Sequence, residues 1–356
     1  MSDPVNLNEY EALARERLPP MVFDYYAGGA NDESTLAANT RSWQRLRLRP
    51  RALVDVSRVD AATTLLGRRV TMPVLTAPCS FNALAHPEGE CAVARATAAA
   101  GIIQIVSMTA TKSIEEIAAA AEGPRWFQLI CFRDREITRD LVRRAEAANC
   151  SAFCLTVDQP LQGRRERDIR NRFTLPAGLT MRNLAPYAAD RLSADGISGM
   201  AKFVDEMFDA SFTWEVVAWL ASVAHLPILV KGVLTAADAR LALEHGAAGV
   251  IVSNHGGRQL DGVASTCEAL PEVADAVGGR AEVLVDAGIR RGTDVLKALA
   301  LGARAVIVGR PYLWGLAADG EAGVGRVLEL LRREIILAMG LAGRPVIREI
   351  DRTLIL

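Results

Sequence analysis

Residues Val250 to Gly262 read Val-Ile-Val-Ser-Asn-His-Gly-Gly-Arg-Gln-Leu-Asp-Gly, an apolar run that passes directly into a polar turn. Consecutive β-branched residues favour a buried strand, and the glycines that follow indicate where the strand ends. His255 can act as a base near neutral pH, and Arg258 can hold a carboxylate through two parallel hydrogen bonds. The stretch therefore predicts a strand end that carries a reaction site. The plainer alternative is a loop histidine beside a surface arginine.

Two further strand ends of this kind follow along the chain. The run that ends at Asp286-Ala-Gly288 precedes Arg290, and the run Ala305-Val-Ile-Val308 precedes Gly309 and Arg310. Backbone N–H groups and arginine side chains both favour an anion, so these strand ends indicate a phosphate site. In an eight-stranded α/β barrel, the loops after the last two strands are the usual place for a phosphate.

The chain supplies eight apolar runs of strand length, separated by stretches with helical periodicity. This alternation predicts a parallel sheet closed into a (β/α)8 TIM barrel. An open doubly wound sheet is the alternative, but no Gly-x-Gly-x-x-Gly follows the first strand. The predicted strands are Val74–Ala77, Ile102–Ser107, Trp126–Leu129, Phe153–Val157, Ile228–Val230, Val250–Ser253, Val283–Val285 and Ala305–Val308. The predicted helices around them are 88–100, 113–121, 134–148, 235–245, 267–278, 291–301 and 321–339.

One connection is much longer than the others, since only a helix near 212–224 can be discerned between Asp158 and Pro227. Long connections in compact domains are often lids over sites. We therefore predict a single domain over residues 1–356, with a helical N-terminal extension (1–72), a barrel (73–340) and a lid loop after the fourth strand (159–210).

Composition narrows the class of protein. Half of the 356 residues are hydrophobic and the formal net charge is -1, which argues against a nucleic-acid or membrane-surface binder. The six cysteines form no Cys-x-x-Cys pair and predict reduced thiols in a cytoplasmic protein. The first residues show neither a basic nor an apolar region, so we expect no signal peptide, and the sequence contains no 18-residue apolar run. No cluster of histidine, cysteine and aspartate has the spacing of metal ligands, so we expect no metal site.

The residues from Ser253 to Asp261 strongly resemble the signature of the FMN-dependent 2-hydroxy acid oxidase and dehydrogenase family. The resemblance runs from Asn8–Ala12 through Tyr25-Tyr26 to Asp286–Asp294 and Gly309–Pro311, which is almost the whole chain. It implies FMN as cofactor and oxidation of an (S)-2-hydroxy acid to a 2-oxo acid. It also implies oxygen or another electron acceptor, and assembly as a homotetramer or octamer.

The resemblance assigns roles by position. His255 resembles the base that takes a proton from the substrate, and Asp158 the partner that orients it. Arg258 and Arg165 resemble the groups that bind the substrate carboxylate, together with Tyr25. Lys231 matches the lysine near flavin N1, and the other implied cofactor positions are Ala77, Pro78, Cys79, Ser107, Gln128, Thr156, Ser253, Asp286, Gly288, Arg290, Gly309 and Arg310.

Two positions depart from the family pattern. Ile130 stands where many members carry a tyrosine after Phe-Gln-Leu, and Thr109 stands where glycolate oxidases carry a tryptophan. Losing the tyrosine hydroxyl would cost roughly 2–4 kcal/mol of transition-state stabilisation, by analogy with oxyanion-hole donors. We therefore expect the pocket formed by Tyr25, Thr109, Ile130, Arg165, His255 and Arg258 to be roomier and more apolar, and to take a larger acid than glycolate.

Two other classes of protein stay open as alternatives. One is a barrel flavoenzyme with different chemistry, such as an isomerase, which the pairing of His255 with Arg258 disfavours. The other is a flavin-binding protein with little oxidase activity. Membrane-bound members of the family carry an apolar anchor in the long loop, where this chain has Arg172, Arg182, Asp190, Arg191 and Asp195. We therefore expect no attachment to a membrane.

Overall fold

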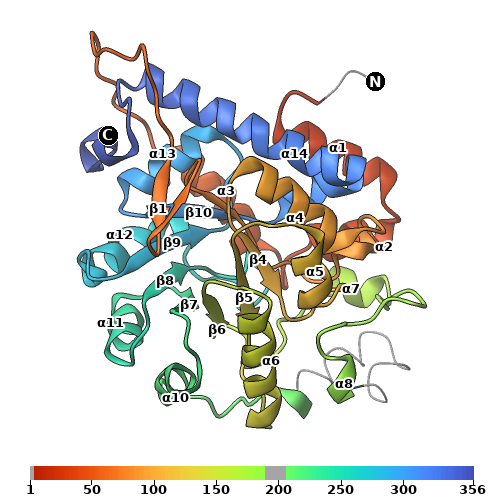
Figure 1. Cartoon of the computed structure of the whole chain (residues 1–356). Coiled ribbons are helices and arrows are strands. Elements are labelled where there is room, and N and C mark those ends of the chain that lie inside the picture. The colour runs from red at the N-terminus through yellow and green to blue at the C-terminus, as the bar shows by residue number, and fades with distance from the viewer. Residues whose placement is uncertain (1–3, 189–205) are drawn as a thin grey trace.

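The computed structural model describes residues 4–188 and 206–356. Its centre is a closed barrel of parallel strands in the order β10-β3-β4-β5-β6-β7-β8-β9, so the predicted (β/α)8 barrel is confirmed. Figure 1 shows the strands in the middle of the molecule with helices around them. The strands are β3 Val74–Thr76, β4 Gln104–Ser107, β5 Arg125–Leu129, β6 Phe153–Thr156, β7 Ile228–Val233, β8 Gly249–Val252, β9 Glu282–Asp286 and β10 Ala305–Val308.

Alternate residues of each strand face opposite sides of the barrel wall. In β8, Ile251 belongs to the apolar cluster inside the barrel, whereas Val250 and Val252 belong to the larger cluster between strands and helices. Because both faces are buried, each strand is a continuous apolar run rather than an alternating one. The barrel interior also contains Leu65 and Val70. They come from an antiparallel pair, β1 Thr63–Leu65 and β2 Arg68–Val70, that the sequence analysis missed.

The helices follow the strands as predicted, with one correction. Two of them begin with a capping box, at Ser113 and Ser265, which satisfies backbone donors at the helix start. The last helix, predicted at 321–339, instead begins directly after β10 and is kinked at Asp319 and Gly320. The helices are α4 Gly89–Ala100, α5 Ile114–Ala120, α6 Arg135–Ala147, α10 Glu215–Val223, α11 Ala236–Glu244, α12 Thr266–Val277, α13 Gly292–Ala300 and α14 Arg310–Leu341, and short 3-10 turns lie at Asn82–Leu84, Ile347–Glu349 and Arg352–Leu354.

The N-terminal residues form three helices, α1 Leu7–Arg17, α2 Pro20–Ala27 and α3 Ser34–Arg45. In Figure 1, α1 lies against α14, and the contacts between the two helices agree with this. The apolar helix α2 is buried along most of its length and ends at Gly28. It thereby brings Tyr25 and Tyr26 to the rim of the barrel.

The long connection after β6 contains two short helices, α7 Glu166–Arg170 and α8 Ala185–Ala188, that were not predicted. Part of the predicted lid loop, residues 189–205, lies outside the described part of the chain. This part includes Asp190, Arg191 and Asp195. No helix among the described residues is long and apolar enough to cross a membrane.

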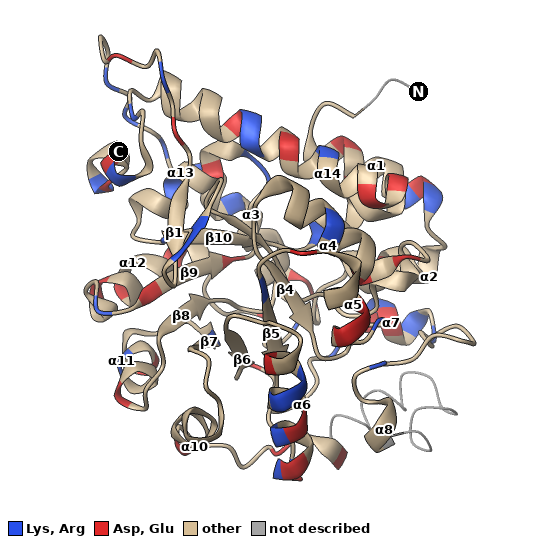
Figure 2. Cartoon of the chain, in the orientation of Figure 1, with Lys and Arg blue, Asp and Glu red and all other residues tan. Residues whose placement is uncertain are grey.

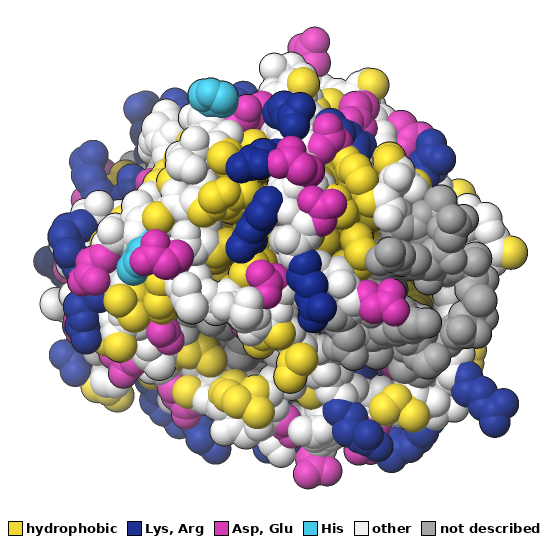
Figure 3. Space-filling view, turned by 90° about the horizontal axis from the view of Figure 1, so that it is seen from below, with side chains coloured by type: hydrophobic (Ala, Val, Ile, Leu, Met, Phe, Trp, Pro, Cys, Tyr) yellow, Lys and Arg dark blue, Asp and Glu magenta, His cyan; other side chains and the backbone are white. Residues whose placement is uncertain are grey.

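Charged residues lie mostly on the helices and loops around the barrel, as Figure 2 shows. The face in Figure 3 carries basic and acidic side chains side by side, with hydrophobic ones between them. This mixture agrees with the formal net charge of -1. All six cysteines are free thiols.

Candidate active site

A cavity of about 420 Å³ opens at the C-terminal ends of the barrel strands. Active sites of this fold lie at that end. Of the predicted site residues, all except Asp158 and Ser253 line the cavity, and these two contact residues that do. The predicted residues in the lining are Tyr25, Ala77, Pro78, Cys79, Ser107, Thr109, Gln128, Ile130, Thr156, Arg165, Lys231, His255, Arg258, Asp286, Gly288, Arg290, Gly309 and Arg310.

His255 lies in the turn that follows β8. It adopts a left-handed backbone conformation with φ of 57°, and Gly257 follows with φ of 76°. A Cβ atom on Gly257 would lie 2.6 Å from the backbone nitrogen of Leu36, so only glycine fits there. The His255 backbone N–H donates to Ser253 Oγ at 3.1 Å. This turn directs the imidazole into the cavity, beyond the end of the strand.

The imidazole of His255 is paired with a carboxylate. Its Nδ1 lies 2.9 Å from Asp158 Oδ1. Since an ionised carboxylate can only accept, Nδ1 donates and Nε2 is left as the acceptor. Burial lowers the pKa of His255, although the Asp158 charge opposes this shift. The ring is therefore neutral near pH 7 and can accept a proton at Nε2.

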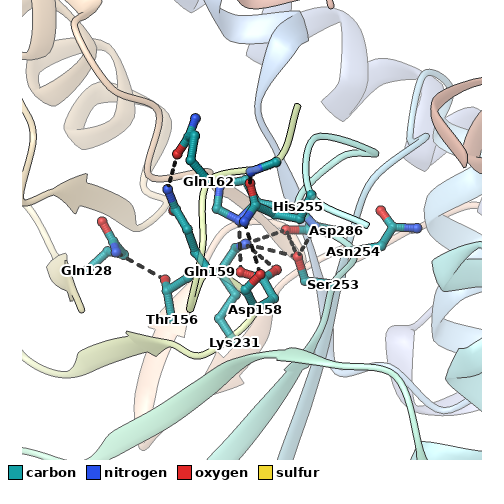
Figure 4. Close-up of polar contacts among 12 residues, drawn as sticks. Gln128, Thr156, Asp158, Gln159, Gln162, Lys231, Ser253, Asn254, His255 and Asp286 are labelled. Carbon is teal, nitrogen blue, oxygen red and sulfur yellow. Dashed lines mark hydrogen bonds and ion pairs between the residues drawn. The ribbon is translucent and has the colours of Figure 1, made fainter. Parts of the chain in front are cut away.

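Behind His255 lies a small network of charged groups (Figure 4). The ammonium of Lys231 donates to Ser253 Oγ at 2.9 Å and lies 3.5 Å from Asp286 Oδ2 and 4.0 Å from Asp158 Oδ2. Burial would lower the pKa of Lys231, but the carboxylates of Asp158 and Asp286 raise it above the ordinary value. Burial would likewise raise the pKa of Asp158, but the charges of His255 and Lys231 hold it below its usual range. Lys231 is therefore a buried, permanently charged cation.

Two arginines and a tyrosine form the part of the cavity nearest to α2. Arg258 donates from Nη1 to the carbonyls of Tyr25, at 2.7 Å, and Gly28, at 2.9 Å. Its guanidinium lies 5.2 Å from the centroid of the Tyr25 ring. Burial, together with the charge of Arg258, lowers the pKa of Arg165 to about 10. Two neighbouring guanidiniums in a buried setting favour an anionic ligand such as a carboxylate.

Hydroxyl and amide groups form a row across the ends of β4, β5 and β6. Gln128 donates from Nε2 to Thr156 Oγ1 at 3.1 Å, and Ser107 Oγ lies 3.2 Å from Gln128 Oε1. Thr109 extends the row, since its Oγ1 lies 2.8 Å from Ser107 Oγ and 2.6 Å from Ser80 Oγ. Such a row can donate to and accept from the polar edge of a flat ring system.

The arginines after β9 and β10 mark a second anionic region. Arg310 donates to the carbonyls of Tyr26, Gly28 and Gly256, and Arg290 donates to that of Ile289. Burial, followed by the charges of Arg258 and Arg290, lowers the pKa of Arg310 to about 9. A bound dianion would relieve this repulsion, and the first N–H groups of α14 lack partners within the helix. The region has the properties of a phosphate site.

These features fit FMN, the cofactor that the sequence resemblance implies. The Oδ1 atom of Asp286 is buried and has no hydrogen-bond partner among the described residues, so it can accept from a ligand hydroxyl. The row from Ser107 to Thr156 suits a ring edge, and Arg290 and Arg310 suit a phosphate. Ala77, Pro78 and Cys79 supply the wall after β3. Burial raises the pKa of Cys79, so its thiol stays protonated.

Several lining residues were missed by the sequence analysis. The side chains of Met108, Phe173 and Phe208 add apolar surface to the cavity, next to Ile130. Phe173 stacks on Tyr25 with ring centroids 4.3 Å apart and planes at 10°. Phe173 directly follows the charged run of the long connection, and its apolar character there was the available signal. No group of three or more histidine, cysteine, aspartate or glutamate residues in 4–188 and 206–356 could hold a metal ion.

Comparisons with known proteins agree with this geometry. Residues 14–356 match the family of FMN-dependent dehydrogenases. Glycolate oxidase 3 of Arabidopsis thaliana is 53% identical over 348 residues, which cover 98% of this chain and 95% of the relative. Glycolate oxidase of Spinacia oleracea is 52% identical, with 98% and 94% covered. Among solved structures, mandelate oxidase with (S)-4-hydroxymandelic acid superposes with a TM-score of 0.94 at 46% identity, with 99% and 98% covered.

Proposed function

This chain belongs to the family of FMN-dependent dehydrogenases, and we propose that it oxidises an (S)-2-hydroxy acid to the 2-oxo acid. The observation that carries the proposal is the placement of a neutral histidine, held by a carboxylate, beside two arginines in one cavity. His255 lies 2.9 Å from Asp158 through Nδ1. Arg165 and Arg258 line the same cavity. These groups suit a substrate with a carboxylate next to a hydroxyl.

In the proposed reaction the substrate loses two hydrogens from the C2 alcohol. His255 accepts the hydroxyl proton at Nε2, and Asp158 stabilises the imidazolium that results. Bound FMN supplies the acceptor for the C2 hydrogen and its two electrons. Arg165 and Arg258 hold the carboxylate with Tyr25 beside them, which orients C2 and its hydroxyl toward the base.

The same geometry suggests how FMN is held. Ser107, Gln128 and Thr156 would meet the ring system, and Lys231 would place a positive charge near its N1. Ser253 would be held in place by Lys231 and Asp286, to which it is hydrogen-bonded. The ribityl and phosphate end would lie at Asp286, Gly288, Arg290, Gly309 and Arg310. Lys231 would stabilise negative charge that develops on the reduced ring.

We propose a substrate with a larger apolar group than glycolate has, such as an aromatic acid. Ile130 is 5% exposed, and its side chain has no group that can donate a hydrogen bond. Met108, Phe173 and Phe208 line the same cavity and offer further apolar contact. The mandelate oxidase whose structure superposes on this chain was solved with an aromatic hydroxy acid. Burial of a phenyl group against these side chains would favour binding by about 2 kcal/mol.

The acceptor of the electrons and the assembly belong to this proposal as well. The names of the oxidase relatives suggest oxygen as the acceptor. A quinone or a protein would also be able to take the electrons from the reduced flavin. A homotetramer or octamer and a cytoplasmic location complete the proposal. Six free thiols agree with a reducing compartment.

The proposal is tested by anaerobic mixing of the FMN-loaded protein with a panel of 2-hydroxy acids while the flavin absorbance is followed. We expect an aromatic acid such as (S)-mandelate to bleach the flavin faster than glycolate or lactate. The Ile130→Tyr variant, which restores a hydroxyl donor, should narrow this difference. Faster bleaching by glycolate would refute the substrate class, and no bleaching by any acid would refute the activity. Readmitting air then shows whether oxygen reoxidises the flavin.

A further inference from the structure

The segment that carries Arg165 into the cavity has little structure of its own. Its helix, α7, is five residues long, Glu166–Arg170, and a helix of this length is unstable in isolation. Arg165 Nη2 lies 3.5 Å from Gln259 Oε1, which is a weak contact. Its Nη1 and Nη2 can also donate to the amide oxygen of Gln162, at 3.1 and 3.2 Å, but Gln162 belongs to the same segment of the long connection. The position of the Arg165 guanidinium therefore depends on what holds the backbone of this segment.

Two carboxylates hold α7, that of Asp24 on α2 and that of Glu33 in the turn before α3. Arg167 Nη2 lies 2.5 Å from Glu33 Oε2, and its Nη1 lies 3.4 Å from Asp24 Oδ1. Asn171 donates from Nδ2 to the other oxygen of Asp24 at 2.7 Å. Figure 1 shows α7 next to α2, and the contacts between them agree. We refer to Asp24, Glu33, Arg167 and Asn171 as the α7 clamp.

The clamp is joined to the second substrate arginine by the turn between α2 and α3. Glu33 Oε1 accepts from the backbone N–H of Gly29 at 2.9 Å, so one carboxylate binds both the turn and Arg167. The carbonyl of the preceding residue, Gly28, accepts from Arg258 Nη1 at 2.9 Å. In the same turn, the Asn31 N–H donates to the carbonyl of Arg164 at 2.9 Å. The turn between α2 and α3 therefore contacts both the segment that carries Arg165 and the side chain of Arg258.

The charges explain why such a clamp is needed. The positive charge of Arg258 disfavours that of Arg165, so the two guanidiniums repel each other when no anion lies between them. Arg167 adds a third cation on the same short segment, and Asp24 and Glu33 supply the opposite charges. These three side chains are partly buried, with exposed fractions of 34%, 28% and 22%. Ion pairs in such a setting are screened less by salt than fully exposed ones.

We propose that Arg167, Asp24 and Glu33 are positioning residues that hold Arg165 opposite Arg258 by an ion-pair clamp. The inference rests on the proposed function, in which these two arginines bind the substrate carboxylate. Removing the clamp weakens the binding of the 2-hydroxy acid before and during the reaction alike. It therefore raises KM more than it lowers kcat.

The test uses the FMN-loaded full-length protein and steady-state kinetics with its best 2-hydroxy acid. We expect Arg167→Ala to raise KM roughly fivefold, the effect of losing about 1 kcal/mol of charged hydrogen bonding, with kcat within about twofold. Arg167→Lys keeps the charge and should recover part of the loss. The matched control is Arg170→Ala, because Arg170 lies on the same helix but pairs with Glu166 of that helix. Equal KM values for the Arg167→Ala and Arg170→Ala variants would overturn the proposal.

A second readout is independent of activity. Amide hydrogen exchange of residues 163–173 should be faster in Arg167→Ala and in Glu33→Gln than in the parent protein, and unchanged in Arg170→Ala. The Arg167→Ala/Glu33→Gln double variant should speed exchange by less than the sum of the two single effects, since the two changes share the Arg167–Glu33 pair. If the parent protein oxidises no 2-hydroxy acid, the proposed function fails while the exchange data still decide the clamp. Unchanged exchange in all variants would overturn the clamp.

Discussion

The pairing of His255 with Asp158 yields a prediction whose size follows from the geometry. Asp158→Asn keeps the shape of the side chain but removes the charge that lies 2.9 Å from His255 Nδ1. Two unit charges about 4 Å apart interact by about 4 kcal/mol at an effective dielectric constant of about 20. The parent protein gains this interaction as His255 takes up the proton. The Asp158→Asn variant therefore loses about half to all of it as transition-state stabilisation. Flavin reduction should therefore slow roughly 30- to 900-fold.

The same substitution should also shift the pH dependence of flavin reduction in a definite direction. Burial lowers the pKa of His255, whereas Asp158 raises it. The neutral ring is the active base, so the rate of reduction should rise through the pKa of His255 and level off above it. Without the Asp158 charge this pKa falls further, and the rise should move to lower pH with a lower plateau.

The assay is stopped-flow reduction of bound FMN without oxygen, measured between about pH 5 and pH 9. Asp275→Asn is the matched control, because Asp275 forms an exposed ion pair with Arg352 and neither residue lines the cavity. The control should react at the parent rate. A loss below about threefold in Asp158→Asn, or a rise displaced to higher pH, would refute the role of Asp158 as the partner of the base.

Three further predictions concern cofactor binding and the turn after β8. Arg310→Ala should weaken FMN binding roughly 10- to 100-fold in fluorescence titrations, because a charge-assisted hydrogen bond to phosphate is lost, and unchanged affinity would contradict the phosphate site. Lys231→Met should lower the flavin reduction potential by roughly 30 mV or more in spectroelectrochemistry, whereas an unchanged potential would contradict its role near the ring. Gly257→Ala should destabilise the fold by about 2 kcal/mol in thermal unfolding, and Gly325→Ala, whose Cβ meets open space, should not.

The barrel could be predicted because each strand is a short apolar run that ends at a polar residue or glycine. The β1–β2 pair was missed because its strands have three residues each and include Arg68 and Arg69. The first third of α14, residues 310–320, was missed because Gly315 and Gly320 are poor helix formers. Tertiary packing outweighs that propensity, and the helix bends at Gly320 instead of ending there.

The residues of the candidate site that could be predicted are those at strand ends, since the fold brings the C-terminal ends of all barrel strands to one rim. His255, Lys231 and Asp286 are of this kind. Phe173 and Phe208 could not be predicted, because the side on which a long connection folds is not encoded in local periodicity. The same holds for the α7 clamp, whose partners are separated by more than a hundred positions along the chain.

A single-turnover measurement tests the central claim most directly. The FMN-loaded protein and its His255→Ala variant are each mixed anaerobically with (S)-mandelate, and both the loss of flavin absorbance and the 2-oxo acid formed are quantified. We predict one 2-oxo acid for each flavin bleached in the parent protein, and bleaching slowed at least 1000-fold in the variant, about 4 kcal/mol of transition-state stabilisation. Equal rates in the two proteins, or bleaching without a 2-oxo acid, would contradict the account.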